Sequence, residues 1–231
     1  MANIKEIFLS IQGEGPYIGY RQLFIRFCGC NLNCAYCDTD FAIKDCKIET
    51  KSGSNSFAPL KNPMEPKELI QIISRFKDYH SISLTGGEPL LEYGFLEKLI
   101  PDLKAPVYLE TNGTLPLNLL RVIKLVDFIS MDIKIPSSTG QKSYFAEHHD
   151  FIEIALKNRK EIFAKAVVTN KITKSEIDYL AQIAQKIPLI IQPVTTTDNK
   201  LIINKEKLFA ISEKIPSARI IPQTHNYIGI L

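Results

Sequence analysis

The sequence predicts an α/β fold: a partial, splayed TIM-type barrel of about six βα units with a mostly parallel sheet. Two observations carry this prediction. Short apolar segments of strand length alternate with helical apolar periods along most of the chain, as βα units do. The chain has 231 residues, whereas eight complete units normally need about 250, so closure into a full barrel is not expected. A doubly wound open sheet is the alternative architecture.

The amino-terminal part precedes this alternation. Ile4 to Leu9 and Leu23 to Phe27 predict two short strands, and the Gly and Pro residues of Gln12-Gly13-Glu14-Gly15-Pro16 predict the turn between them. Lys51 to Pro66 is rich in Ser, Asn, Pro and Gly and has no apolar period. We therefore expect an exposed loop insertion at 51–66, within a single domain that spans residues 1–231.

The βα series follows the insertion. Pro66 suits the first position of a helix, and Thr173 with Glu176 forms a capping box ahead of another. The helices are expected near 66–76, 91–103, 117–124, 151–156, 173–184 and 204–211, and the strands at 81–84, 107–110, 128–133, 162–168, 189–192 and 218–221.

Bulk composition excludes several classes of protein. Lys plus Arg number 28 against 25 Asp plus Glu, and a net charge of +3 is too small for a dedicated nucleic-acid or membrane-surface binder. The first twenty residues contain no apolar segment of signal-peptide length, and no window approaches 18 uninterrupted apolar residues. We expect a soluble, cytoplasmic protein that binds neither membrane nor nucleic acid directly.

Five cysteines fall between residues 28 and 46, an odd number that argues against a disulfide framework. Cys30, Cys34 and Cys37 form C-x3-C-x2-C on a loop directly after a strand. Three such thiolates can hold a 4Fe-4S cluster and leave one iron without a protein ligand, because a cluster usually takes four cysteines. A tetrahedral zinc site with Cys28, Cys46 or a His as fourth ligand is the alternative. We expect Cys28 and Cys46 to be buried small side chains.

A second motif, Thr85-Gly86-Gly87-Glu88-Pro89, follows the strand at 81–84, where its glycines let a ligand approach the backbone. Together with the cysteine motif it closely resembles the radical S-adenosylmethionine (SAM) superfamily. Members of this superfamily use the open iron to bind the amino and carboxylate groups of SAM. The reduced cluster then cleaves SAM to a 5′-deoxyadenosyl radical, which abstracts hydrogen from the substrate.

The resemblance implies a set of cofactor contacts at the carboxyl ends of the strands. Tyr36 would lie beside the adenine, and Gly86, Gly87 and Glu88 would contact the methionine amine. The full set implied for the cofactor is Tyr36, Asp38, Gly86, Gly87, Glu88, Ser130, Met131, Asp132, Gln192 and Pro193. No side chain is expected to be catalytic itself, because the cofactor carries the radical.

Further residues resemble one family of the superfamily, the radical enzymes that convert 6-carboxy-5,6,7,8-tetrahydropterin into 7-carboxy-7-deazaguanine with loss of ammonia. They are Ile11-Gln12-Gly13-Glu14-Gly15, Arg26, Cys37-Asp38-Thr39 and Gln223-Thr224-His225-Asn226-Tyr227. Gln12 and Glu14 could pair with the polar pterin edge, and Arg26 could hold the substrate carboxylate with two hydrogen bonds. The resemblance implies Thr39 as a Mg²⁺ ligand. The implied substrate contacts are Ile11, Gln12, Gly13, Glu14, Arg26, Thr85, His225 and Leu231.

The same resemblance implies a homodimer and an electron donor such as flavodoxin or ferredoxin. Two other functions fit the cysteine spacing. One is an activase that places a glycyl radical on a protein partner, and the other is a non-catalytic iron–sulfur or zinc-binding module. His148 and His149 are expected to be solvated loop residues without a role in the site.

Overall fold

The computed structural model describes residues 1–37, 46–195 and 200–230, in which the strands form one ten-stranded sheet. In spatial order the strands are β10 (Arg219–Ile220), β9 (Leu189–Pro193), β8 (Glu161–Val168), β7 (Phe128–Ile133), β6 (Val107–Thr111), β5 (Ser81–Gly86), β2 (Arg21–Phe27), β1 (Ile4–Ile11), β3 (Cys46–Glu49) and β4 (Phe57–Leu60). The pairs from β2 through β5 to β10 are all parallel, whereas β1 runs antiparallel to β2.

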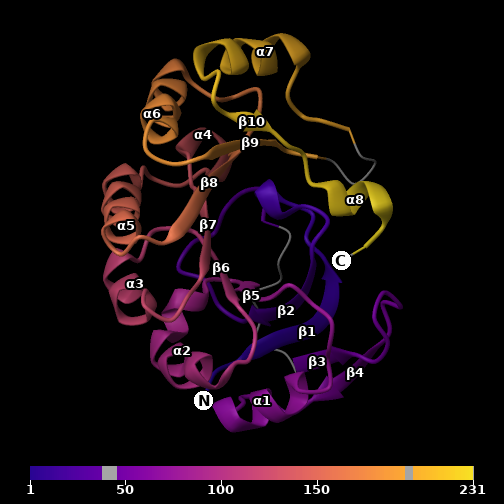
Figure 1. The fold of residues 1–231 in the computed structure, drawn as a ribbon. Coiled ribbons are helices and arrows are strands. Elements are labelled where there is room, and N and C mark those ends of the chain that lie inside the picture. The colour runs from indigo at the N-terminus through magenta and orange to yellow at the C-terminus, as the bar shows by residue number, and fades with distance from the viewer. Residues whose placement is uncertain (38–45, 196–199, 231) are drawn as a thin grey trace.

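The sheet curves around a central space but does not close, since β10 and β4 lie at its two edges (Figure 1). This confirms the predicted α/β class with a splayed, mostly parallel sheet. The helices are α1 (Pro66–Ile73), α2 (Tyr93–Leu99), α3 (Pro116–Val122), α4 (Pro136–Thr139), α5 (Phe145–Lys157), α6 (Lys174–Ala184), α7 (Lys205–Lys214) and α8 (Thr224–Ile228). Among the described helices, none has the length and apolar content that a membrane span requires.

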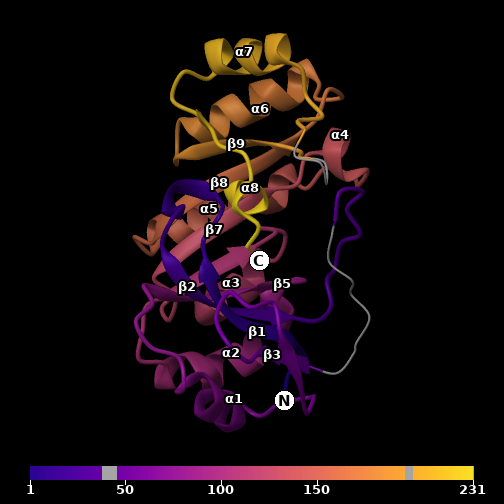
Figure 2. The same cartoon turned by 90° about the vertical axis from the view of Figure 1, so that its right-hand side faces the viewer.

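Helices α2, α3, α5 and α6 cover the convex side of the sheet, whereas α8 crosses its open side (Figures 1 and 2). The two predicted helix starts are confirmed. Pro66 occupies the first turn of α1, and the Thr173 hydroxyl accepts a hydrogen bond from the Glu176 amide at the start of α6. The short α4 and α8 were not predicted, because neither is long enough to show a helical apolar period.

The expected loop insertion is wrong in part. Residues 57–60 form β4, which pairs antiparallel with β3, and β3 in turn pairs with the free edge of β1. The backbone groups at the edge of β1 need partners, and this hairpin supplies them. Residues 51–56, at the tip of the hairpin, are exposed as expected.

Strand alternation divides the interior into two environments. Side chains on the convex face, such as Leu109 and Ala164, enter the main apolar core under the helices. Side chains on the concave face change in character along the strands. Near the strand starts they are aromatic, and Tyr108 and Phe163 pack with Tyr17 from the β1–β2 connection. Nearer the carboxyl ends they are polar, so an aromatic layer closes one end of the space and a polar site lies above it.

Candidate functional site

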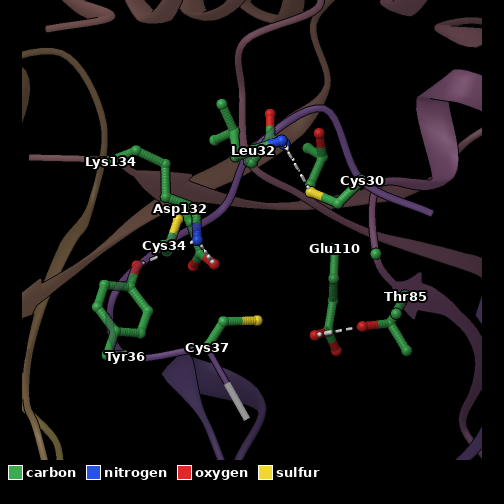
Figure 3. A pocket seen from close by; sticks show the side chains of 13 residues that line it. Cys30, Leu32, Cys34, Tyr36, Cys37, Thr85, Glu110, Asp132 and Lys134 are labelled. Carbon is green, nitrogen blue, oxygen red and sulfur yellow. Dashed lines mark hydrogen bonds and ion pairs between the residues drawn. The ribbon is translucent and has the colours of Figure 1, made fainter. Parts of the chain in front are cut away.

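The cysteine loop directly follows β2 and lines a pocket with about 530 Å³ of free space (Figure 3). The wall opposite comes from the ends of β5, β6 and β7. The lining residues are Cys30, Leu32, Cys34, Tyr36, Cys37, Thr85, Gly86, Gly87, Glu110, Thr111, Asn112, Asp132 and Lys134. We call this the cofactor pocket. All three cysteines of the motif line it as free thiols, whereas Cys28 and Cys46 are buried outside it.

Neighbouring loops hold the cysteine loop in place. The Ala35 amide donates to the Thr139 carbonyl at 2.8 Å, and the Gln141 side chain donates to the Asn33 carbonyl at 2.8 Å. The Cys30 sulfur accepts contacts from the Leu32 amide at 3.4 Å and from the Asn112 side-chain amide at 3.8 Å. The cysteine loop is therefore held by hydrogen bonds to neighbouring segments, and these bonds involve no bound group.

The glycines after β5 allow a close backbone approach. Gly86 has φ +108°, a conformation that favours glycine, and a Cβ on Gly87 would lie 1.7 Å from the Gly29 carbonyl oxygen. The Glu88 amide donates to that carbonyl oxygen at 2.9 Å. The turn after β5 and the cysteine loop are thus in direct contact, and only glycine fits at position 87.

Glu88 is held by hydrogen bonds at the ends of two neighbouring strands. Its carboxylate is fully buried and accepts hydrogen bonds from the Leu90 amide, the Thr111 hydroxyl and the Asn112 amide, at 2.7 to 3.0 Å. It is not among the residues that line the cofactor pocket. Burial raises the pKa of Glu88 to about 7 despite these hydrogen bonds. Its side chain joins the ends of β5 and β6.

The end of β7 carries two polar side chains, the charged Asp132 and the neutral Ser130. The Asp132 carboxylate points to the pocket and pairs with the Lys134 ammonium at 3.0 Å, which in turn donates to the Tyr36 hydroxyl at 3.2 Å (Figure 3). Ser130 is buried on the same face and lines neither this pocket nor its neighbour. Met131 points the other way, into the apolar core, so only its backbone could contact a ligand.

His148 is fully buried on α5, and the expectation of a solvated loop residue was wrong. Its Nε2 lies 3.2 Å from the Asn112 carbonyl oxygen and 3.5 Å from the Lys134 amide nitrogen, beneath the ends of β6 and β7. Burial lowers the pKa of His148 to about 4, so the ring is neutral at pH 7. His149, one residue on, is exposed as expected, but it too lies on α5 rather than in a loop.

A second pocket, with about 650 Å³ of free space, adjoins the first and shares Thr85, Gly86 and Glu110 with it. We call it the substrate pocket. Its other lining residues come from the two ends of the chain: Ile11, Gln12, Gly13, Glu14, Phe24, Arg26, Gln223 and His225. Seven of the eight residues implied for substrate binding thus surround one space. The eighth, Leu231, lies outside the described residues, as do Asp38 and Thr39.

Glu110, at the shared wall, organises one side of the substrate pocket. Its carboxylate accepts hydrogen bonds from the Gln12 side-chain amide at 2.9 Å and from the hydroxyls of Ser83 and Thr85 at 2.9 and 3.1 Å. The Gln12 amide also donates to Gln22 at 3.0 Å. These bonds orient the polar end of Gln12 before any ligand arrives.

Glu14 is the centre of a second network. Its carboxylate contacts the Lys165 ammonium and accepts hydrogen bonds from the side-chain amides of Gln192 at 3.1 Å and Gln223 at 2.7 Å. Burial alone would raise the pKa of Glu14, but Lys165 above all lowers it to about 2. Glu14 is therefore ionised. Gln192 reaches this network rather than the cofactor pocket, and Pro193 follows it at the end of β9.

Arg26 and the carboxyl-terminal tail complete the substrate pocket. The Arg26 guanidinium pairs with Glu6 at 3.2 Å and lies 5.1 Å from the centre of the Phe8 ring. Thr224 donates to the Gly13 carbonyl through its amide, at 2.9 Å, and its hydroxyl, at 3.0 Å. His225 packs so closely on Gly13 that a Cβ there would lie 2.2 Å from its Nδ1.

Sequence motifs did not identify Glu110, Asn112, Lys134 or Lys165. Each lies in or directly after a parallel strand, and all but Lys165 line the cofactor pocket. The available signal was the alternation of Tyr108 with Glu110 and of Phe163 with Lys165, which puts a charge two residues beyond an aromatic on one face. That signal becomes useful only once the concave face of the sheet is known.

The three thiols of the motif line one pocket. A cubane cluster binds each cysteine through a different iron, so this arrangement is compatible with a 4Fe-4S cluster. The Asp132 carboxylate, which lines the same pocket, offers polar contacts for a ligand next to such a cluster.

Comparison with protein families agrees with this chemistry. The Radical SAM superfamily matches residues 24–184 of the chain. That range begins within β2 and ends with α6, and it contains the cysteine loop, the glycine turn and the Asp132 strand end.

Curated relatives match over nearly the whole chain. A 7-carboxy-7-deazaguanine synthase of Geobacter sulfurreducens is 41% identical, covering 100% of this chain and 98% of its own. One from Archaeoglobus fulgidus is 36% identical, with 99% of each chain covered. Among solved structures, the "Crystal structure of QueE from Escherichia coli" matches with a TM-score of 0.58 at 21% identity, covering 97% of this chain and 94% of that one. This structural match supports the fold.

Proposed function

Since this chain belongs to the radical SAM superfamily and, within it, to the 7-carboxy-7-deazaguanine synthase family, we propose that it converts 6-carboxy-5,6,7,8-tetrahydropterin into 7-carboxy-7-deazaguanine with loss of ammonia. The chain is a radical SAM lyase that acts on a small molecule. The observation that carries the proposal is the shared wall of Thr85, Gly86 and Glu110, because it lets a cofactor in one pocket face a substrate in the other.

The cofactor pocket fits the group that the family uses. Cys30, Cys34 and Cys37 would hold the 4Fe-4S cluster, and Gly86 and Gly87 would offer backbone groups to SAM. When bound, the cluster and SAM supply the radical that removes hydrogen from the substrate. Tyr36, with its hydroxyl already fixed by Lys134, would cover the adenine. Asp132 and Ser130, on the next strand but one, would bind the polar remainder of the cofactor.

The substrate pocket suits a flat heterocycle with a polar edge and a carboxylate. Glu14, held ionised by Lys165, would accept hydrogen bonds from the pterin N–H groups. Gln12 would present the opposite polarity from the same turn. The Arg26 guanidinium would bind the substrate carboxylate while it keeps its ion pair with Glu6. His225, packed on Gly13, would close the pocket and exclude water.

Four further features of the proposal rest on family resemblance. Thr39, beside Asp38, would bind Mg²⁺ with the substrate. The enzyme would receive electrons from a flavodoxin or ferredoxin, and it would act as a homodimer in the cytoplasm. None of the five cysteines forms a disulfide, which is compatible with a reducing compartment.

The test is an anaerobic incubation of reconstituted protein with the tetrahydropterin, SAM, Mg²⁺ and a reductant. We expect a new ultraviolet-absorbing deazaguanine and one ammonia per product, from protein that carries about four irons per chain. Iron-loaded protein that cleaves SAM but forms no deazaguanine would contradict the substrate assignment. Zinc as the sole stoichiometric metal after anaerobic purification would contradict the reaction class.

A further inference from the structure

A line of alternating charges crosses the interior from one pocket to the other. Glu14 contacts Lys165, whose ammonium lies 3.4 Å from the Asp132 carboxylate. Asp132 pairs in turn with Lys134 at 3.0 Å, and Lys134 donates to the Tyr36 hydroxyl at 3.2 Å. We call these five residues the charge chain. It begins on the β1–β2 turn, passes through β8 and β7, and ends on the cysteine loop.

Lys165 contacts both Glu14, which lines the substrate pocket, and Asp132, which lines the cofactor pocket. Its residue is 4% exposed, and it does not line either pocket. A buried ammonium is costly unless it is paired, and here two carboxylates from different elements compensate it. Burial alone would lower the pKa of Lys165, but Asp132 and then Glu14 raise it well above the usual value. The side chain is therefore charged at pH 7.

Each partner of Lys165 has other contacts on its own side. Glu14 also accepts hydrogen bonds from Gln192 and Gln223, which tie it to β9 and the tail. Asp132 also binds Lys134 on the cofactor side. Lys165 adds the connection between these two groups, and it does so from the middle of β8, where the strand pairing with β7 and β9 fixes its backbone.

We propose that Lys165 is a positioning residue that sets the substrate-recognising Glu14 turn against the cofactor-binding Asp132 strand end. The proposal deepens the proposed function and rests on it. Hydrogen abstraction requires the two reacting atoms to meet at a defined distance, and a misplacement of about 1 Å can cost roughly 100-fold in rate. Lys165 acts through Glu14 and Asp132, and it touches no reacting atom itself.

The test compares Lys165→Met, Lys165→Arg and the control Lys160→Met. Lys160 directly precedes β8, at the end away from the site, and donates to the Val126 carbonyl at 2.7 Å. Substrate affinity is measured anaerobically by calorimetry with the tetrahydropterin. Turnover assays then give KM, kcat and the ratio of 5′-deoxyadenosine to deazaguanine. A merely structural role would reduce the amount of active enzyme and leave affinity, KM and this ratio unchanged.

For Lys165→Met we expect pterin affinity to fall about tenfold, kcat to fall roughly 100-fold, and 5′-deoxyadenosine per product to rise. Lys165→Arg should recover most of each loss, and Lys160→Met should match wild type. If Lys165→Met does not fold, Lys165→Gln takes its place. Wild-type affinity and an unchanged product ratio in the folded variant would overturn the proposal. Wild-type protein that forms no deazaguanine would instead refute the proposed function, whereas pterin binding still reports on Lys165.

Discussion

The cofactor pocket and the substrate pocket share a wall but are built in different ways. The cofactor pocket is lined by one short motif and by successive strand ends, and the three cysteines of the motif are free thiols. In the substrate pocket, residues from both ends of the chain already bind one another, with Glu14 accepting hydrogen bonds from two glutamines.

This difference indicates what holds the side chains of each pocket in place. The cofactor pocket supplies three thiols that a bound cluster would engage. The substrate pocket is preorganised by its own network, which reduces the entropy lost when a ligand binds. Changes to the first should therefore abolish the chemistry, and changes to the second should weaken substrate recognition in graded steps.

The largest effect is expected from Cys34→Ala. Cys34 lines the cofactor pocket, and its loss leaves only two of the three thiols that would hold the cluster. Cleavage of SAM should be abolished while the protein stays folded, as measured by 5′-deoxyadenosine formation and circular dichroism. Cys46→Ala is the control, since Cys46 is buried outside the pocket and its removal should leave the iron content unchanged. Retained cleavage in Cys34→Ala would remove this thiol from the cluster site.

Glu14→Gln tests the preorganised pocket at its centre. The substitution removes the charge that Lys165 compensates and that the pterin edge would meet. We expect kcat/KM for the pterin to fall about 100-fold, equivalent to about 2.7 kcal/mol, mostly through KM. Cleavage of SAM without substrate should change little. Glu153→Gln, on the exposed face of α5, is the control. Equal losses of SAM cleavage and of pterin turnover would show that the two pockets do not differ in this way.

Gly13→Ala tests the contact between the two ends of the chain. The added methyl group would lie 2.2 Å from the His225 Nδ1, so the tail must move away from the turn. We expect KM for the pterin to rise roughly tenfold with a smaller change in kcat. The control is Gly94→Ala, in α2, where the added methyl meets no atom within 4 Å and favours the helix. An unchanged KM in Gly13→Ala would mean that tail packing does not shape the substrate pocket.

The last effect concerns stability beneath the cofactor pocket rather than turnover. The pKa of His148 is about 4 in the fold and 6.5 as a free side chain, so the unfolded state binds more protons between these values. Stability should fall as the pH drops from 6.5 to 4, by at most roughly 3 kcal/mol. Denaturant unfolding across this range should show a weaker pH dependence for His148→Gln than for wild type.

Two comparisons separate this effect from other titrations. Glu88, with a pKa raised to about 7, acts in the opposite sense, because its stabilising protonated form is lost as the pH rises from 4.5 through 7. The informative quantity is thus the difference between His148→Gln and wild type at each pH. His149→Gln, at the exposed neighbouring position, should leave the pH dependence as it is in wild type. Identical slopes for all three proteins would mean that His148 is not buried in neutral form.

Much of the fold could be predicted because strand and helix periods are local. The βα series from α1 onward follows directly from them, with the start of α6 specified by Thr173 and Glu176. The β3–β4 hairpin was missed because the Ser, Asn and Gly residues at its tip obscure two strands of four residues each. The burial of His148 was missed because α5 begins at Phe145, earlier than its apolar residues indicate.

The sequence by itself determined the chemistry that a contiguous motif can carry: three thiols that can hold a cluster, and a glycine turn whose backbone a ligand can approach. Only the tertiary structure decided which charges meet. Glu14 and Lys165 are 151 residues apart, and their contact follows from the curvature of the sheet, which turns one face of every strand toward a common space. Alternation along a strand tells which residues share a face, but which face is enclosed depends on how distant strands close around it.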